Sequence, residues 1–219
     1  MEKSDKSTNL EKFMALSDNK RDRIINAAMK EFRHGYKRAS TDTIVKEAAI
    51  SKGLLFHYFG TKENLYEFLV RFTMDTLQKD YFNMIELGQQ DVIASIWQQA
   101  LLMRDISDKY SCIYDFLSAI HIHAKETGAS DMCAASLYVK RTADVMEDMY
   151  NNCDTNLFRS DIDHKQAIDL ILWGINGFFH DAQRRMITEN GTSNHSYDIF
   201  SNELRSYLDI FQLVFYKEG

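Results

Sequence analysis

Apolar side chains recur every three or four residues along most of the chain, which is the spacing of one face of an α-helix. The first clear helix begins at Ser17 or Asp18, either of which can cap it, and ends near Gly35, where a left-handed conformation suits glycine. Residues 1–16 begin polar and become weakly amphipathic, so we expect a frayed tail there. The inner face of the helix carries Ile24, Ile25, Ala28 and Phe32.

Two short helices and one long helix are predicted next. Ser40 and Ser51 are suited to cap the short ones, because a serine hydroxyl can accept a hydrogen bond from a backbone N–H of the first turn. Thr61 has the same role before a long helix that extends to about Tyr81. The inner faces of the three helices are formed by Ile44, Val45 and Ala48, by Leu55 and Phe59, and by Leu65, Phe68, Leu69 and Phe72.

The rest of the chain keeps the helical period and shows no alternation typical of strands. Its two most apolar segments lie at the end, at about residues 164–187 and 196–216. We therefore predict an all-α fold of about nine helices, with a small N-terminal three-helix domain and a larger C-terminal helical domain. The expected boundaries are a tail at 1–17, the small domain at 18–62 and the large domain at 63–219.

Charge divides the 219-residue chain in the same place. The whole chain has a net charge of -6, but residues 18–62 carry ten basic and five acidic side chains, a net charge of +5, and residues 63–219 a net charge of -11. This asymmetry indicates that only the N-terminal domain approaches a polyanion.

The two short helices have the dimensions of a helix-turn-helix, whose second helix enters the major groove of DNA. Ser51 and Lys52 stand at the N-terminus of that second helix, where backbone N–H groups and the helix dipole favour a phosphate. Gly53 leaves room for close backbone approach. The surface that faces the groove is then formed by Leu54, His57 and Tyr58.

Residues 20–69 resemble the tetracycline-repressor (TetR) family, through the run RIINAAMKEFRHGYKRASTDTIVKEAAISKGLLFHYFGTKENLYEFL. The resemblance implies phosphate contacts by Lys52, Tyr58 and Lys62. Three positions depart from the family pattern: Ala49 replaces a turn glycine, Leu54 a common threonine and Phe56 a tyrosine. A left-handed Ala49 would cost about 1 kcal/mol, which the turn can absorb. The predicted DNA-binding residues are Ser40, Thr41, Thr43, Ser51, Lys52, Gly53, Leu54, His57, Tyr58 and Lys62.

Family members place a ligand cavity and a dimer interface in their C-terminal helices, and both have candidates here. For each cavity candidate, ordinary core packing is the simpler alternative. Small residues at Gly174 and Gly177 would let a second helix approach closely and favour a dimer interface. The cavity candidates are Trp97, Met103, Tyr114, Tyr138, Met146 and Trp173. The dimer candidates are Gly174, Gly177, Phe178, Phe179, Phe200, Leu204 and Phe211.

Other classes of function have little support. His121 and His123 would point about 200° apart on a helix, and no metal-binding or catalytic motif is present, so we expect no metal, no cofactor and no enzyme. Three cysteines without C-x-x-C spacing and no long apolar run predict a cytoplasmic protein with no membrane segment.

We therefore predict a repressor that binds palindromic operator DNA as a homodimer and is released by an unknown small-molecule effector. The alternative is a TetR-like DNA-binding protein without an effector, acting through protein partners in chromosome organisation or cell division.

Overall fold

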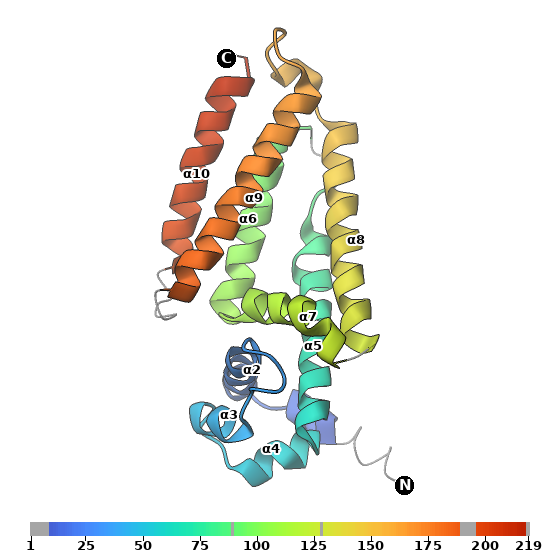
Figure 1. The fold of residues 1–219 in the computed structure, drawn as a ribbon, viewed down its shortest axis with the longest axis vertical. Coiled ribbons are helices and arrows are strands. Elements are labelled where there is room, and N and C mark those ends of the chain that lie inside the picture. Colours follow the sequence, from blue (N-terminus) through green and yellow to red (C-terminus); the bar gives the residue numbers. More distant parts are fainter. Residues whose placement is uncertain (1–8, 89, 128, 189–195, 218–219) are drawn as a thin grey trace. The chain divides into compact units, whose positions relative to one another are not determined.

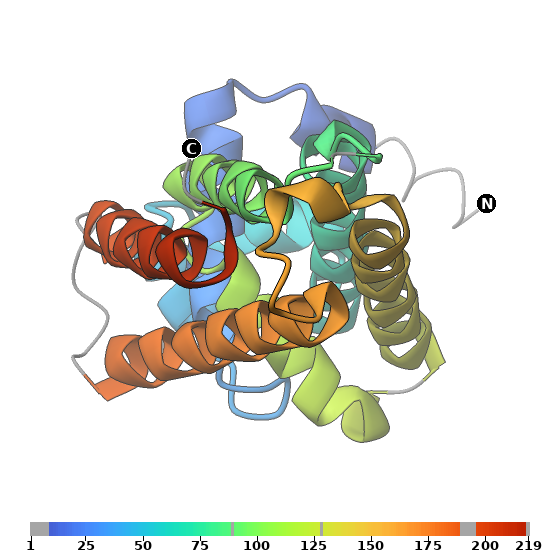
Figure 2. The same cartoon turned by 90° about the horizontal axis from the view of Figure 1, so that it is seen from above.

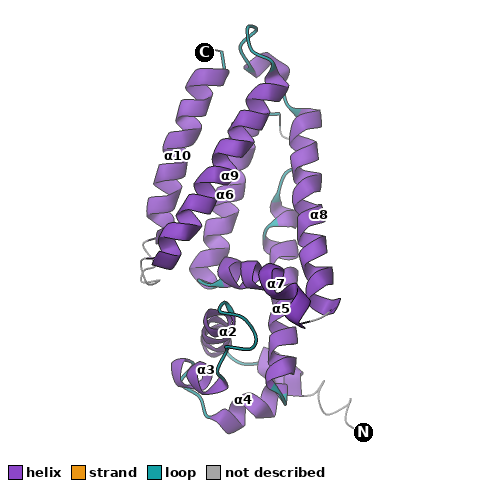
Figure 3. Ribbon diagram, viewed as in Figure 1, coloured by secondary structure: helices purple, strands orange, loops and turns teal. Residues whose placement is uncertain are grey.

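The computed structural model describes residues 9–88, 90–127, 129–188 and 196–217, with side chains outside 123–132 and 182–200. Ten α-helical segments account for most of these residues, and an isolated bridge between Phe158 and Tyr216 is the one β-type pairing that joins them (Figure 3). The predicted all-helical fold is therefore confirmed.

The described residues form two compact units, which are labelled by helix in Figure 1. The first unit contains the residues up to Lys79 and Lys109–Lys140, and the second contains Asp80–Asp108 and the chain from Arg141 onward. A helical segment at residues 9–14 precedes α2. The other helices are α2 (Asp18–Phe32), α3 (Thr41–Glu47), α4 (Lys52–Phe59), α5 (Lys62–Asp80), α6 (Val92–Lys109), α7 (Ile113–Thr127), α8 (Ala129–Asn152), α9 (His164–Thr188) and α10 (Ser196–Phe215), with short 3₁₀ turns η1 (Phe82–Met84) and η2 (Thr155–Leu157).

Local signals place the helix ends of the first unit. The hydroxyl of Ser40 accepts from the N–H of Thr43 at 3.4 Å, and that of Ser51 accepts from the N–H of Leu54 at 3.1 Å, which caps α3 and α4 as predicted. Thr61 caps α5 in the same way. Gly35 has the left-handed conformation expected after α2, with φ of 96°.

Helix α7 packs against α2 within the first unit. The side-chain amide of Asn26 donates to the carbonyl of Lys109 at 2.9 Å and accepts from the N–H of Ser111 at 3.1 Å. Arg33, which directly follows the end of α2, forms an ion pair with Asp115 at 3.3 Å. Polar contacts of this kind fix α2 to the segment that begins α7, so α7 belongs to the same packed body as the first short helices.

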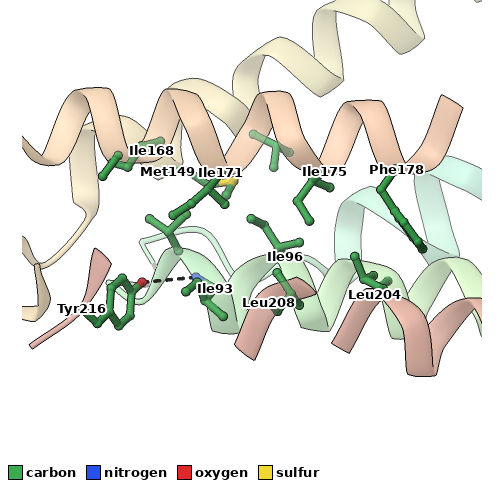
Figure 4. Packing of buried hydrophobic residues seen from close by; sticks show 14 of the residues in the cluster. Ile93, Ile96, Met149, Ile168, Ile171, Ile175, Phe178, Leu204, Leu208 and Tyr216 are labelled. Atoms are coloured by element: carbon green, nitrogen blue, oxygen red, sulfur yellow. Dashed lines mark hydrogen bonds between the residues drawn. The ribbon is translucent and has the colours of Figure 1, made fainter. Parts of the chain in front are cut away.

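The second unit is built around apolar faces of α6, α8, α9 and α10. Figures 1 and 2 both show α9 and α10 lying side by side. In Figure 4, Ile171 and Ile175 of α9 point toward Ile96 of α6 and Leu208 of α10. These four side chains are at most 6% exposed, so they form a dry core rather than the wall of an open site.

The residues after α10 are fastened to the start of α6. Asp91 caps α6 by accepting from the N–H groups of Ile93 and Ala94, and the hydroxyl of Tyr216 donates to the same carboxylate oxygen at 2.9 Å. Figure 4 shows the accompanying bond from the N–H of Ile93 to the Tyr216 hydroxyl, 3.4 Å long. Burial raises the pKa of Tyr216, so this phenol keeps its proton and its role as a donor.

Candidate nucleic-acid interface

The turn between α3 and α4 has the backbone that the sequence predicted. Ala49 is left-handed, with φ of 52°, and is the one non-glycine residue with positive φ in the described chain. The N–H of the next residue, Ile50, bonds to the carbonyl of Val45 at 3.0 Å, which closes the end of α3. The turn therefore tolerates alanine at a position that favours glycine.

Helix α4 has one buried face and one accessible face. Leu55 and Phe59, four residues apart, are 1% and 6% exposed and anchor the helix in the first unit. The opposite side leaves its N-terminal residues and His57 exposed and leaves Leu54 and Tyr58 half-buried. No neighbouring atom lies within 4 Å of the position that a Cβ on Gly53 would occupy, so the backbone there is open to an approaching ligand.

Helix α3 and its N-cap contain three further residues that the sequence predicted to bind DNA. Thr43 is exposed, and Ser40 and Thr41 are half-buried. Ser40 is already engaged as the cap of α3, so its hydroxyl has one acceptor position in use. Figure 1 shows α3 and α4 in succession, joined by the turn described above.

Two predicted phosphate-binding lysines have intramolecular partners. The ammonium of Lys52 lies 2.8 Å from Oδ1 of Asp42 on α3. Lys62 donates to the carbonyl of Ala39 at 2.5 Å and lies over the ring of Tyr36, with Nζ 4.7 Å from the ring centroid. Burial lowers the pKa of Lys62, because removing the ammonium from water disfavours its charge.

One residue of this site was missed by the sequence analysis. Phe13, in the segment expected to be a frayed tail, is 0% exposed. Its ring meets Tyr58 and Phe59 of α4 and Phe68 of α5, with centroids 5.5, 4.8 and 5.4 Å apart. The segment at residues 9–14 is thus a packed support for α4. The sequence signal was the weak amphipathic spacing of Leu10, Phe13 and Met14, which extends over too few residues to indicate a packed helix.

The cavity candidates are distributed over both units. Tyr114 and Tyr138 belong to the first unit, and the other four belong to the second. Trp97 is half-buried, with the guanidinium of Arg205 5.3 Å from its ring centroid. Met103 and Met146 are also half-buried, whereas Trp173 is 67% exposed on α9.

The dimer candidates also have different environments. Phe178 and Leu204 lie in the core of the second unit, and Phe179 and Phe211 pack against it. Gly174 and Gly177 are exposed, and a Cβ on Gly174 would lie 2.5 Å from Cζ of Phe211, so this glycine lets α10 approach α9 within one chain. The side chain of Phe200 lies outside the described residues.

Beside these glycines, α9 and α10 expose large apolar side chains that the sequence analysis did not select. We call this set the α9–α10 apolar face. It consists of Leu170 and Trp173 on α9 and Tyr207, Ile210, Leu213 and Val214 on α10, between 43% and 77% exposed.

Within the described residues, no helix is long and apolar enough to cross a membrane, and no group of three His, Cys, Asp or Glu side chains is placed to hold a metal ion. Cys112 is buried, Cys133 exposed and Cys153 half-buried, and burial raises the pKa of the Cys112 thiol.

A capped, accessible second helix in a helix-turn-helix is the arrangement with which DNA-binding proteins of this class enter the major groove. The family model "Bacterial regulatory proteins, tetR family" matches residues 24–69, which include α3, α4 and the start of α5. Over these residues the chain is similar to that family of regulators. The resemblance found in the sequence is thereby confirmed.

Two known proteins show how far the similarity extends. The HTH-type transcriptional regulator HbdR of Aromatoleum sp. (strain CIB) is 33% identical over 72 residues, which are 32% of this chain and 31% of that protein. The match thus spans about a third of the curated relative. A TetR family regulator from Chloroflexus aurantiacus J-10-fl has a similar fold over 95% of this chain and 98% of its own, with a TM-score of 0.57 and 14% identity.

Proposed function

We propose that the chain is a transcriptional repressor that acts in the cytoplasm and binds palindromic operator DNA as a homodimer. The observation that carries the proposal is the accessible N-terminus of α4. There, Ser51 caps the helix, Lys52 extends from its first turn, and the space beside Gly53 is open. Free N–H groups, the helix dipole and a lysine together favour a DNA phosphate.

We assign base recognition to side chains beyond the first turn of α4. His57 is exposed and can donate or accept a hydrogen bond, while Leu54 offers only an apolar contact, such as one with a thymine methyl group. Tyr58 is half-buried between Phe13 and solvent, which suits a hydroxyl that reaches the backbone of DNA. We therefore assign phosphate contacts to Lys52 and Tyr58 and base contacts to Leu54 and His57. Exposed Thr43 of α3 is a further phosphate contact.

A second copy of the chain is the proposed occupant of the α9–α10 apolar face. Its side chains are 43% to 77% exposed, so much of their apolar area stays in water in a single chain, and an accumulation of large exposed apolar side chains marks interaction sites. A two-fold axis through this face would pair α9 and α10 with their copies in a four-helix interface. Two recognition helices would then read half-sites roughly 34 to 36 Å apart. The chain itself supplies the apolar complement, which is why we favour a copy over another partner.

We further propose that residues 63–219 bind a small-molecule effector whose binding releases the operator. In the second unit, Oε1 of Gln98 and Oγ of Ser107 are buried and make no hydrogen bond in the described chain, so each lacks a partner that a bound ligand or water could supply. A tenfold loss of operator affinity requires an effector that prefers the released state by about 1.4 kcal/mol. By linkage, operator DNA must weaken effector binding by the same factor.

Selection of bound sites from random duplex DNA tests the function directly. We expect enrichment of a palindrome and binding that weakens steeply with salt, because phosphate contacts release counterions. Enrichment of no sequence, with binding independent of salt, would reject the DNA-binding interface. Titration of a candidate effector with and without the selected duplex then tests induction: equal affinities would show that the compound is no inducer. Retention of a partner protein on the DNA, without any effector response, would favour the alternative function.

A further inference from the structure

A single peptide group at the start of α3 is held by two oppositely charged side chains. The carbonyl of Ala39 accepts from Nζ of Lys62 at 2.5 Å, and the N–H of Ser40 donates to Oε1 of Glu31 at 2.8 Å. The carbonyl of one residue and the N–H of the next belong to one planar unit. Lys62 from α5 and Glu31 from α2 therefore form hydrogen bonds to the two ends of the same peptide group.

The lysine is directed toward its own protein. Its Nζ lies 4.7 Å from the ring centroid of Tyr36 and 5.9 Å from that of Phe32, which places the charge against two aromatic rings. The lowered pKa has the same cause, since part of the ammonium's hydration is lost. Lys62 is half-buried, in contrast to the exposed Lys52. Glu31 is half-buried as well and approaches the peptide group from the other side.

The peptide group between Ala39 and Ser40 determines where α3 begins. Ser40 is the N-cap of α3, with φ of -109° and ψ of 120°, and its hydroxyl accepts from the N–H of Thr43. Because the plane of the preceding peptide group is fixed, the direction in which the first turn of α3 leaves is fixed too. Thr41 and Thr43 follow within that turn, and α4 follows after one tight turn.

We propose that Glu31 and Lys62 form a charged clamp that positions the helix-turn-helix, and that Lys62 acts through α3 and contacts no phosphate. This rests on the proposed DNA contacts of α3 and α4. The family resemblance implied instead that Lys62 contacts a phosphate. The positioning role of Lys62 requires Glu31, whereas a phosphate contact by Lys62 does not. A clamp needs both members, whereas an acidic residue near DNA weakens phosphate binding, so its removal would strengthen binding.

The experiment uses the full chain and the duplex that it selects from random DNA, with affinity measured between about 50 and 200 mM salt. The variants are Glu31→Ala, Glu31→Gln and Lys62→Met, with Glu67→Ala as the control, because Glu67 is an exposed acidic residue of α5. Methionine keeps much of the lysine stem but has no charge, and glutamine keeps an oxygen that can accept from Ser40. Circular dichroism and thermal melting establish that each variant is folded.

We expect Glu31→Ala and Lys62→Met each to weaken binding by about tenfold, the size of one lost charge-assisted hydrogen bond, with an unchanged salt slope. Glu31→Gln should stay within about threefold of the wild type, and Glu67→Ala should bind as well as the wild type or better. The double variant Glu31→Ala/Lys62→Met should lose little more than either single variant, because the two side chains act on one peptide group.

A lowered salt slope of about one unit for Lys62→Met, together with unchanged or tighter binding by Glu31→Ala, would overturn the clamp and restore the phosphate contact. If Lys62→Met does not fold, the comparison of Glu31→Ala with Glu67→Ala still tests the clamp. Equal affinities of these two variants for the selected duplex would reject it. A wild-type protein that binds no DNA would instead reject the proposed function, and that result is separate from any difference among the variants.

Discussion

Nζ of Lys52, at the N-terminus of α4, lies 2.8 Å from Oδ1 of Asp42 on α3. Both side chains are well exposed, at 51% and 74%, so water and salt screen the pair and it adds at most about 1 kcal/mol to stability. A phosphate can therefore replace Asp42 at low cost. The carboxylate competes with DNA for the lysine and, in the free protein, holds it across the surface of α3 and α4.

This pair leads to two opposite expectations. Lys52→Ala should weaken binding to all DNA sequences and lower the salt slope by about one unit, because one phosphate contact is lost. Asp42→Asn should strengthen binding severalfold for all sequences, because a repulsive charge is removed and Lys52 is released. Fluorescence anisotropy with selected and scrambled duplexes over a salt series measures both. Asp75→Asn on α5 is a charge-matched control. A folded Lys52→Ala variant with an unchanged slope would contradict the phosphate contact.

The turn between α3 and α4 is strained at Ala49, and a glycine should relieve it. A left-handed non-glycine residue costs about 1–2 kcal/mol, while glycine costs about 0.5–1 kcal/mol through the entropy of the unfolded chain. Ala49→Gly should therefore raise the free energy of unfolding by about 0.5–1 kcal/mol, as measured by urea denaturation. Ala27→Gly within α2, where φ is not positive, is the comparison and should destabilise the protein. A destabilised Ala49→Gly would show that the turn is not strained.

Phe13 supports the recognition helix, so its removal should affect both stability and DNA binding. Phe13→Ala should lower the free energy of unfolding by about 3–5 kcal/mol, because it leaves a cavity among Tyr58, Phe59 and Phe68. Met14→Ala is the neighbouring control, since that side chain is 44% exposed, and its effect should stay within about 0.5 kcal/mol. Hydrogen exchange of the α4 amides should quicken in Phe13→Ala alone. Equal protection of α4 in the two variants would show that residues 9–14 do not support it.

The α9–α10 apolar face should hold the dimer together. A charge placed there must be buried without a partner when two copies meet, so Trp173→Glu and Leu213→Glu should each give monomers at micromolar concentration. Leu87→Glu is the matched control, because Leu87 is 66% exposed in the same unit but lies outside this face. Light scattering after size-exclusion chromatography measures the molar mass of each variant in solution. A wild-type monomer, or dimers in all three variants, would reject this interface.

The sequence alone determined the features that depend on near neighbours in the chain. The caps at Ser40, Ser51 and Thr61 and the buried pair Leu55 and Phe59 all follow from residues at most four positions apart, whereas the left-handed Ala49 was expected from the family resemblance. Such features can be predicted from the sequence because helical periodicity and end capping depend only on residues close together in the chain. For that reason the helix-turn-helix is recognisable from the order of its residues alone.

The tertiary structure decided which of these residues have partners and which are available. Lys62 reaches a carbonyl 23 positions away, and Phe13 meets a ring 55 positions away, so neither contact has a local signal. Trp173 looks like a core residue in the sequence, yet α9 turns it outward because its neighbours Ile171 and Ile175 fill the core. Periodicity shows that a helix has an apolar face, but only packing against other helices determines which part of that face is covered and which part is free to bind.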